Sequence, residues 1–152
     1  MARPQSIAFR ALDLHVIQGR ADDSALVTAT GTLSYAQLLH ESASLAGGLR
    51  ELGLRAGAPV HLEVPDRHVW VVGVLAIVRL GAEPDPQASF TIAGDPAVIS
   101  AGGEEYELDL VLRAGRVDPA AAAVHDEGDY GERMERQYGD VLATLLHGGT
   151  LT

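Results

Sequence analysis

The sequence contains no lysine, and all 11 of its basic residues are arginines. Schiff-base chemistry is therefore excluded, as is any mechanism that needs an ammonium group on a substrate phosphate or carboxylate. Cysteine is also absent, which excludes disulfides and a thiol nucleophile. Two common routes to covalent catalysis are thus closed to this chain.

Positive charge is scarce, since 21 acidic residues face 11 basic ones and the formal net charge is -10. Nucleic acids and anionic membranes both attract clustered lysine and arginine, so neither is an expected partner. The longest apolar run, 69–78, is far shorter than the ~20 residues of a membrane span. The first 20 residues lack the apolar centre of a secretory signal, so we expect a cytoplasmic protein.

The remaining composition is that of a globular protein. Hydrophobic residues make up 47% of the chain and charged residues 21%. A length of 152 residues is enough for one domain with a core, but not for two large domains. We therefore expect a single domain over residues 1–152.

Residues 24–53 carry the patterns of a hairpin and a capped helix. Two β-type runs flank Gly31, which predicts the hairpin. Ser34 and Gln37 have the spacing of a capping box, so a helix is predicted to begin there. This helix presents an apolar stripe and is predicted to stop at Gly53, where glycine favours a left-handed conformation.

A strand and a second helix are predicted next. The run VHLEV at 60–64 predicts a strand, and Asp66 is a suitable N-cap for a helix that ends at Gly81. Because this helix is apolar on nearly all sides, we expect it to be buried on more than one face. The alternation of strands and helices favours a parallel α/β sheet.

The second half has weaker patterns. PAVIS (96–100) and EEYELDLVLR (104–113) predict another hairpin, because apolar residues alternate in the second run. Residues 118–124 fit either a short helix or a tightly packed strand. A last helix is predicted from near Asp129 to His147, followed by a glycine stop and the start of a final strand.

A group of potential metal ligands lies at 125–129. His125, Asp126, Glu127 and Asp129 offer an imidazole and three carboxylates, which are suitable ligands for a divalent cation. Their spacing is not that of an EF-hand loop, and a solvated turn with a helix N-cap explains the same residues. The turn is the favoured interpretation. These four are the weak metal candidates, and no catalytic or cofactor-binding residue is assigned.

Other candidates for acid–base work are isolated. His61 and Glu63 lie on one face of the predicted strand with His68 nearby, but a surface-facing pair is the favoured interpretation. The glycine-rich stretches at 101–103 and 148–150 lack the basic residue of a phosphate loop and are interpreted as a turn and a helix stop. The remaining histidines and serines form no constellation: His15, His40, His147, Ser34 and Ser100.

Several short patterns between Ala25 and Pro86 follow one another in a fixed order. They are Leu33-Ser34-Tyr35 with Leu38, then Ala46, Leu49 and Gly53, then Gly57 and Val60, then Pro65-Asp66, and finally Gly81-Ala82. This order resembles the N-terminal region of the adenylate-forming superfamily, which contains the acyl-CoA synthetases, the adenylation domains of peptide synthetases and the luciferases. The resemblance implies the fold and is silent on the substrate.

From 87 to 152 the resemblance is thinner. Residues 117–124 look like the strand before the family's phosphate loop, and 140–151 look like a later helix-to-strand step. The family's loop is rich in Ser, Thr and Gly, ends in Pro-Lys-Gly and cradles ATP phosphates, whereas the residues that follow Val124 here are His-Asp-Glu-Gly-Asp. Like charges ~4 Å apart cost about 4 kcal/mol at an effective dielectric constant of ~20, so this loop is unsuited to phosphate.

The resemblance therefore implies a shortened relative. The family's adenine-binding segment and its lysine-bearing lid lie later in full-length enzymes, so we expect neither in 152 residues. The expected fold is a three-layer α/β domain, with a mainly parallel sheet flanked by helices and one or two hairpins.

Three functions follow as hypotheses. The first is a catalytically silent, acyl-CoA synthetase-like protein that acts as a binding or interaction module. The second is an accessory or split component of an ATP-dependent acyl-activating enzyme. The third is a small metal-dependent enzyme that uses His125 and the nearby carboxylates. No cofactor is expected, and the expected partners are a second copy, another protein, or a small acyl or nucleotide ligand. The apolar helix around Trp70 is interpreted as core, with an acyl pocket or a subunit contact as alternatives.

Overall fold

The computed structural model describes residues 4–152, which form two compact units. The first unit combines the N-terminal residues up to His40 with Ala122–Thr152, and the second is Glu41–Ala121. Each is described by itself below. None of the helices within 4–152 is both long and apolar enough to cross a lipid bilayer. The expectation of a single domain stays a prediction.

The first unit begins with a helical run over residues 7–20 that contains two π-helical turns, η1 (Phe9–Asp13) and η2 (Val16–Arg20). No helix was predicted here, although apolar residues recur at helical spacing in this stretch. The buried residues of the run share one face: Ile7, Ala8, Ala11, Leu12 and His15. The predicted hairpin follows and is confirmed, with β1 (Ser24–Thr28) and β2 (Gly31–Ser34) paired antiparallel.

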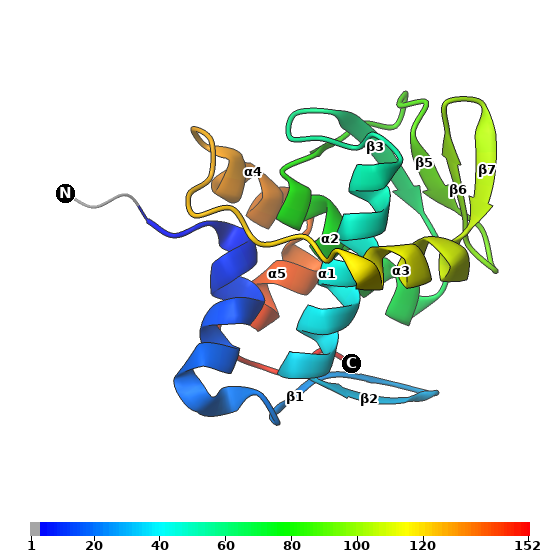
Figure 1. Cartoon of the computed structure of the whole chain (residues 1–152). Coiled ribbons are helices and arrows are strands. Elements are labelled where there is room, and N and C mark those ends of the chain that lie inside the picture. The colour runs from blue at the N-terminus through cyan, green and yellow to red at the C-terminus, as the bar shows by residue number, and fades with distance from the viewer. Residues whose placement is uncertain (1–3) are drawn as a thin grey trace. The chain divides into compact units, whose positions relative to one another are not determined.

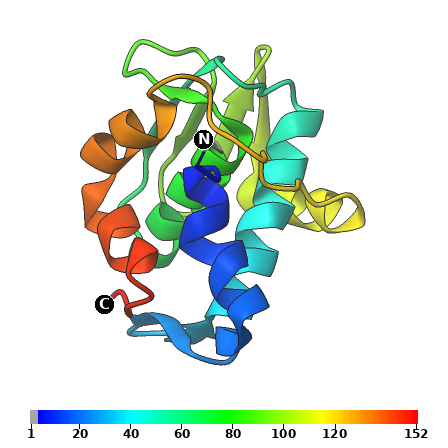
Figure 2. The same ribbon diagram turned by 90° about the vertical axis from the view of Figure 1, so that its left-hand side faces the viewer.

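The end of the chain returns to this hairpin. Leu151 forms a parallel bridge with Leu26 of β1, and the C-terminus lies beside the β1–β2 hairpin in Figure 2. The amide of Leu151 donates to Ala25 O at 2.8 Å, and Val27 N donates to Leu151 O at 2.8 Å. The final strand predicted at the C-terminus is therefore present as a single bridge in the described chain.

The last helix differs from the prediction. Instead of one helix from 129 to 147, the structure has α4 (Tyr130–Gln137) and α5 (Gly139–Leu146), which are separated at Tyr138. Tyr138 has φ -121° and ψ 37°, outside the helical region, and Gly139 follows it. The break lets Tyr138, Val141, Leu142 and Leu145 all be buried.

The second unit contains a five-stranded sheet in the order β4-β3-β5-β6-β7. Figure 1 labels β3, β5, β6 and β7 of this sheet. Its strands are β3 (Pro59–Glu63), β4 (Glu83–Pro84), β5 (Thr91–Ala93), β6 (Val98–Ala101) and β7 (Glu104–Glu107). β3 pairs parallel with β4 and β5, while β5–β6 and β6–β7 are antiparallel, so only β6 runs against the other strands. The predicted α/β class, with a mainly parallel sheet and hairpins, is confirmed.

Two further helices begin and end as the sequence predicts. α1 (Tyr35–Glu51) starts after the Ser34–Gln37 capping box, in which Gln37 N donates to Ser34 Oγ and Ser34 N donates to Gln37 Oε1. α2 (Arg67–Leu80) starts at Asp66, whose side chain accepts from Val69 N. It stops at the left-handed Gly81 and is buried on nearly all sides, as expected.

Residues 108–112 are helical and not a strand. The hairpin β6–β7 ends at Glu107, and α3 (Leu108–Val117) begins there. Alternation at 106, 108, 110 and 112 misled the prediction, because the same residues also fit a helix that buries Val111, Leu112 and Gly115. Residues 119–124 form neither of the predicted elements, so the strand expected before a phosphate loop is absent from this stretch.

Small residues let α1 and α3 approach closely. A Cβ on Gly115 of α3 would lie 1.6 Å from Ser44 O of α1, and one on Gly48 of α1 would lie 2.3 Å from Val111 O of α3. Backbone is therefore packed against backbone. Such contact is possible only where side chains are missing, so these glycines determine where α3 lies against α1.

Candidate functional site

The acidic loop at 125–129 is bound to the start of the N-terminal helix. Ser6 N donates to Val124 O at 3.0 Å, and Ile7 N donates to Asp126 Oδ2 at 2.9 Å. The first amides of a helix have no partner inside the helix, and a carboxylate is favoured there by the helix dipole. Asp126 is therefore a cap for a helix that lies 119 residues earlier in the sequence.

The other loop residues also have structural partners. A ring nitrogen of His125 lies 2.9 Å from Pro4 O, and Asp129 Oδ1 accepts from Arg133 Nε at 3.0 Å. The hydrogen bond from Arg133 lowers the pKa of the Asp129 carboxyl below its usual value. Glu127 is exposed, and its carbonyl oxygen accepts from the first amide of α4 at 2.9 Å. Asp129 stands at the expected N-cap position of α4, but its side chain does not cap that helix.

These side chains do not converge on a common point. Within residues 4–152, no group of three or more His, Cys, Asp or Glu side chains is arranged to hold a metal ion. The weak metal candidates at His125, Asp126, Glu127 and Asp129 are adjacent in sequence but point to different partners. We therefore do not propose a metal-dependent enzyme at this loop.

A small hollow of about 140 Å³ lies beside the loop. One guanidinium, from Arg10, and three carboxylates contribute to its wall. Arg10 Nε is occupied by a hydrogen bond to Gln5 O at 3.0 Å. The lining residues are Pro4, Gln5, Arg10, Asp126, Gly128, Asp129, Gly131 and Glu132. Acidic groups thus outnumber basic ones in the wall, and the hollow is unsuited to a phosphate group.

Gly131 lets α4 approach the Asp126 cap. A Cβ at this position would lie 2.6 Å from Asp126 Oδ2 and 3.6 Å from Ile7 Cβ. A larger residue would push the carboxylate away from the helix amide that it caps. The loop, the N-terminal helix and the first turn of α4 are therefore fitted to one another.

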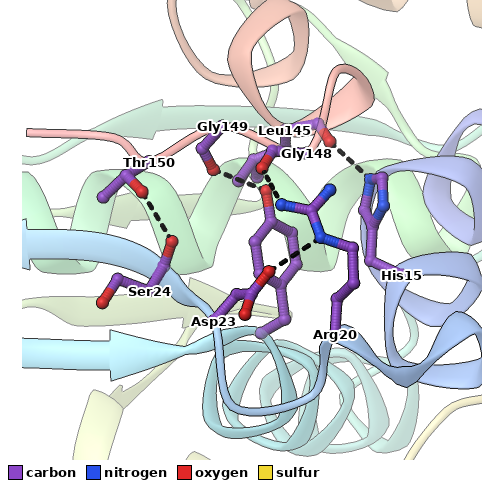
Figure 3. A network of polar contacts seen from close by, with 9 residues as sticks. His15, Arg20, Asp23, Ser24, Leu145, Gly148, Gly149 and Thr150 are labelled. Atoms are coloured by element: carbon purple, nitrogen blue, oxygen red, sulfur yellow. Dashed lines mark hydrogen bonds and ion pairs between the residues drawn. The ribbon is translucent and has the colours of Figure 1, made fainter.

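A second polar network fastens the C-terminal segment to the N-terminal elements (Figure 3). Arg20 donates from Nη2 to Gly148 O at 2.6 Å and from Nε to Asp23 Oδ2 at 2.7 Å. Thr150 Oγ1 donates to Ser24 O at 2.7 Å. We call the contacts between residues 15–35 and 145–151 the C-terminal clasp. It joins two stretches of sequence that make up the first unit.

Tyr35 and His15 complete the clasp. The Tyr35 hydroxyl donates to Gly149 O at 2.5 Å, and His15 Nε2 lies 2.7 Å from Leu145 O. The two rings meet edge to face with centroids 4.9 Å apart. Burial raises the pKa of the Tyr35 hydroxyl, which keeps it a hydrogen-bond donor. His15, which is isolated in sequence, is thus a buried structural residue, as is common for histidine in a core.

The histidines of the second unit pair with carboxylates. His68 Nε2 lies 2.7 Å from Glu41 Oε1, and this hydrogen bond is the main reason that the pKa of His68 is raised. His61 Nε2 lies 3.4 Å from Glu63 Oε2, and Glu63 is mostly exposed, which agrees with a surface-facing pair. His61, Glu63 and His68 do not form a constellation with a nucleophile.

The structure gives the remaining candidates from the sequence a position in the fold. Ser34 is a helix cap, Ser100 lies within β6, and the 101–103 and 148–150 glycine stretches are a hairpin turn and a helix stop, as predicted. His40 and His147 lie at the surface or near it. Asp126, one of the four weak metal candidates, caps the N-terminal helix. Arg20 and Tyr35 were missed as polar partners, because only the fold brings residue 148 to them.

Comparison with known proteins shows which family part of this chain resembles. The sequence pattern of the family described as "AMP-binding enzyme" matches residues 14–86. An uncharacterized protein of Pseudomonas aeruginosa is 40% identical over 119 residues, and an acetyl-coenzyme A synthetase of Rhodopirellula baltica is 33% identical over 146 residues. These alignments cover 74% and 84% of this chain, but only 16% and 21% of the two relatives.

Residues 14–86 thus resemble the AMP-binding enzymes. The fold agrees, since a long-chain-fatty-acid-CoA ligase from Archaeoglobus fulgidus superimposes with a TM-score of 0.66 at 19% identity. That superposition covers 85% of this chain and 34% of the ligase. The predicted relationship to the N-terminal region of adenylate-forming, acyl-CoA synthetase-like enzymes is confirmed. The AMP-binding segment ends at Pro86, as the clear resemblance does, and begins earlier, at residue 14.

Proposed function

We propose that this chain acts as an acyl-CoA synthetase-like binding or interaction module and does not adenylate a substrate by itself. The observation that carries the proposal is the acidic loop. Asp126 caps the N-terminal helix and Asp129 is paired with Arg133, so both carboxylates have structural roles. The loop thus has a reason to be acidic that is unrelated to catalysis.

Electrostatics supports the same proposal. A nucleoside triphosphate in the hollow would be repelled by the carboxylates of Asp126, Asp129 and Glu132 and attracted by the guanidinium of Arg10. At an effective dielectric constant of ~20, each like-charge contact at ~4 Å costs about 4 kcal/mol, and one ion pair at the same distance recovers a similar amount. The balance therefore opposes binding of phosphate next to this loop.

Nucleotide binding and turnover test the proposal directly. Calorimetric titration with Mg-ATP, AMP and coenzyme A should show no saturable binding, and ATP–pyrophosphate exchange with acetate should stay at background. A full-length acetyl-coenzyme A synthetase is the positive control. The triple variant Asp126→Asn, Glu127→Gln, Asp129→Asn distinguishes charge repulsion of ATP from the lack of an ATP site, because it removes the three loop carboxylates. An asparagine in place of Asp126 keeps an oxygen acceptor for the Ile7 amide, so the capping contact is retained. Saturable ATP binding together with exchange by the unmodified chain would refute the proposal.

A second candidate function is that of a component in an acyl-activating enzyme. It is supported by the alignment to acetyl-coenzyme A synthetase, which extends over 84% of the chain and thus well beyond residue 86. On this hypothesis another polypeptide supplies the adenine-binding and lid regions. Affinity capture followed by exchange assays tests it: exchange that appears only in the complex supports it, and an inactive complex opposes it.

We further propose that the protein works in the cytoplasm and that its partner is a protein. Fractionation of cells that produce a tagged chain checks the location. A predominantly membrane-bound or secreted pool would contradict it.

A further inference from the structure

One face of the five-stranded sheet is covered and the other is open. α2 packs on the covered face, where a Cβ on Gly73 would lie 2.9 Å from Leu62 Cδ1. The side chains on this face are buried in β3, β5 and β6: Val60, Leu62, Ile92, Ile99 and Ala101. The residues that alternate with them point to the opposite face and are partly or fully exposed. Parallel strands are normally covered on both faces, so β4, β3 and β5 lack one of the two layers that such strands usually have.

The strand register places the residues of the open face in two rows across β3, β5, β6 and β7. The first row is His61, Thr91, Ser100 and Glu105, and the second is Glu63, Ala93, Val98 and Glu107. Each residue of a row is the register partner of the next one, and neighbouring strands lie about 4.8 Å apart. The two rows therefore cross the same four strands side by side.

These rows form a surface that we call the sheet trough. Its floor, over β5 and β6, has short side chains: Thr91, Ala93, Val98 and Ser100. One rim is on β3, where His61 Nε2 lies 3.4 Å from Glu63 Oε2. The other rim is on β7, where Glu105 and Glu107 are exposed and make no ion pair within residues 4–152. Three strand spacings separate β3 from β7, so the rims are about 14 Å apart.

We propose that the sheet trough binds an amphipathic α-helix of a partner protein, with basic side chains on both flanks of a small apolar stripe. This inference rests on the proposed function as an interaction module and names the chemistry of the partner. An α-helix with its side chains is about 10–12 Å across, which fits between rims about 14 Å apart. The short side chains of the floor let such a helix lie close to the sheet, while its lysine or arginine side chains reach the carboxylates of both rims.

Charge is the reason to assign a basic helix to this face. The rims carry three carboxylates, at Glu63, Glu105 and Glu107, and the only other ionisable group among the eight residues of the two rows is the imidazole of His61. A second copy of this chain has a net charge of -10 and no lysine, so its surface is on average repelled by these rims. Nucleic acid and anionic membranes are repelled for the same reason.

The expected association is weak. The strands that form the trough have three to five residues, so it is about 10–17 Å long and covers two to three turns of a helix. Such a contact is smaller than a standard protein–protein interface. Each exposed ion pair contributes up to about a fivefold change in affinity, and this contribution falls as salt rises.

A designed peptide provides the probe for the first test. It has about 18 residues and forms a helix with an alanine and leucine stripe between two rows of lysines. A scrambled peptide of the same composition controls for attraction of any cation to this acidic chain. In fluorescence anisotropy with the unmodified 152-residue chain, the amphipathic peptide should bind saturably and at least about tenfold more tightly than the scrambled one.

Charge removal at the β7 rim tests where the peptide binds. The variant Glu105→Gln, Glu107→Gln should weaken binding about three- to tenfold, because two ion pairs are lost. The matched control is Asp22→Asn, Glu135→Gln, which removes two exposed carboxylates of the first unit and changes the net charge equally. It should leave the affinity within about twofold of the original.

A substitution in the floor tests the trough itself. Ser100→Arg places a long cationic side chain between the rims and should weaken binding at least about tenfold. Thr32→Arg is the matched control, since Thr32 is an exposed strand residue of the hairpin in the first unit and the change in charge is the same. Far-UV circular dichroism confirms that each variant is folded.

Several results would overturn the proposal. They are no saturable binding, equal affinity for the two peptides, and equal effects of either variant and its matched control. A bound peptide that is extended by circular dichroism would assign the carboxylates to the free edge of β7 instead. A dimer of the chain that is lost in Ser100→Arg and kept in Thr32→Arg would assign the trough to a second copy. The ATP–pyrophosphate exchange assay does not depend on any of these results, so failure of the trough is distinguishable from failure of the proposed function.

Discussion

Replacing Gly115 by alanine tests the closest helix–helix contact in the second unit. The added Cβ would lie 1.6 Å from Ser44 O and 2.7 Å from Gly48 N. A carbon–oxygen contact is normally no shorter than roughly 3.3 Å, so α3 must move away from α1 by about 1.7 Å. Both atoms that Cβ meets are backbone atoms in the interior of α1, so a side-chain rotation cannot relieve the clash.

The cost follows from this geometry. Overpacking a close contact costs about 1–3 kcal/mol, and a backbone clash belongs at the upper end. Alanine recovers about 0.5–1 kcal/mol relative to glycine within a helix. The net expectation is a loss of roughly 2 kcal/mol in the free energy of unfolding, with Val111 and Leu112 drawn out of their buried positions.

Urea unfolding followed by circular dichroism measures this loss. Gly139→Ala is the matched control, because Gly139 begins α5 with ordinary backbone angles and a Cβ there would meet nothing within 4 Å. It should be neutral or stabilise by up to about 1 kcal/mol. If Gly115→Ala is as stable as Gly139→Ala, the close α1–α3 contact described here is wrong.

Three further predictions concern polar contacts. The pKa of His68 is raised in the folded state by Glu41, so their pair stabilises the protein fully below the unfolded pKa of about 6.5 and loses this contribution as pH rises through the folded value. Urea unfolding of wild type and His68→Gln at acidic and alkaline pH should therefore show a gap that narrows as pH rises, and a constant gap would contradict the pairing. Asp126→Ala should destabilise by about 1 kcal/mol in thermal unfolding while Asp126→Asn costs less, because only asparagine keeps an oxygen acceptor for the helix amide. Gly148→Ala should destabilise by about 1–2 kcal/mol, mainly because Gly148 has φ 73°, where an alanine is strained, and because its Cβ would displace the Arg20 guanidinium; unchanged hydrogen exchange in the C-terminal clasp would refute this.

Features that depend on neighbouring residues were predictable from the sequence. The capping box at Ser34 and Gln37 spans three positions, and the Asp66 cap and the Gly81 stop are equally local. Turn chemistry likewise located both hairpins, since Gly31 and the 101–103 stretch allow backbone angles that other residues rarely adopt. Each of these features depends only on residues within a few positions of one another, so it can be predicted without knowledge of the rest of the fold.

Features that depend on distant residues were not predictable. Residues 108–112 fit both the two-residue period of a strand and the 3.6-residue period of a helix. The helix forms because the small residues Gly48 and Ser44 leave room for α3 against α1. The roles in the first unit are similar, because Asp126 caps a helix that lies 119 residues away. The sequence marked Asp126 as important through its charge, but its partner is an amide, which every residue except proline has. Residue type alone does not reveal such a pairing.

The acidity of the 125–129 loop has a sufficient cause in helix electrostatics. The N-terminus of a helix carries partial positive charge and unpaired amides, and it attracts either a side-chain carboxylate or a bound anion. At the start of the N-terminal helix the carboxylate of Asp126 already accepts from Ile7 N at 2.9 Å. A phosphate at the same place would have to displace a ligand that is held there by the chain itself. Since Ser6 and Val124 fix the two backbones together, the carboxylate returns at an effective concentration that a free nucleotide does not reach. The capping contact that stabilises the first unit is therefore also a reason to expect weak phosphate binding beside it.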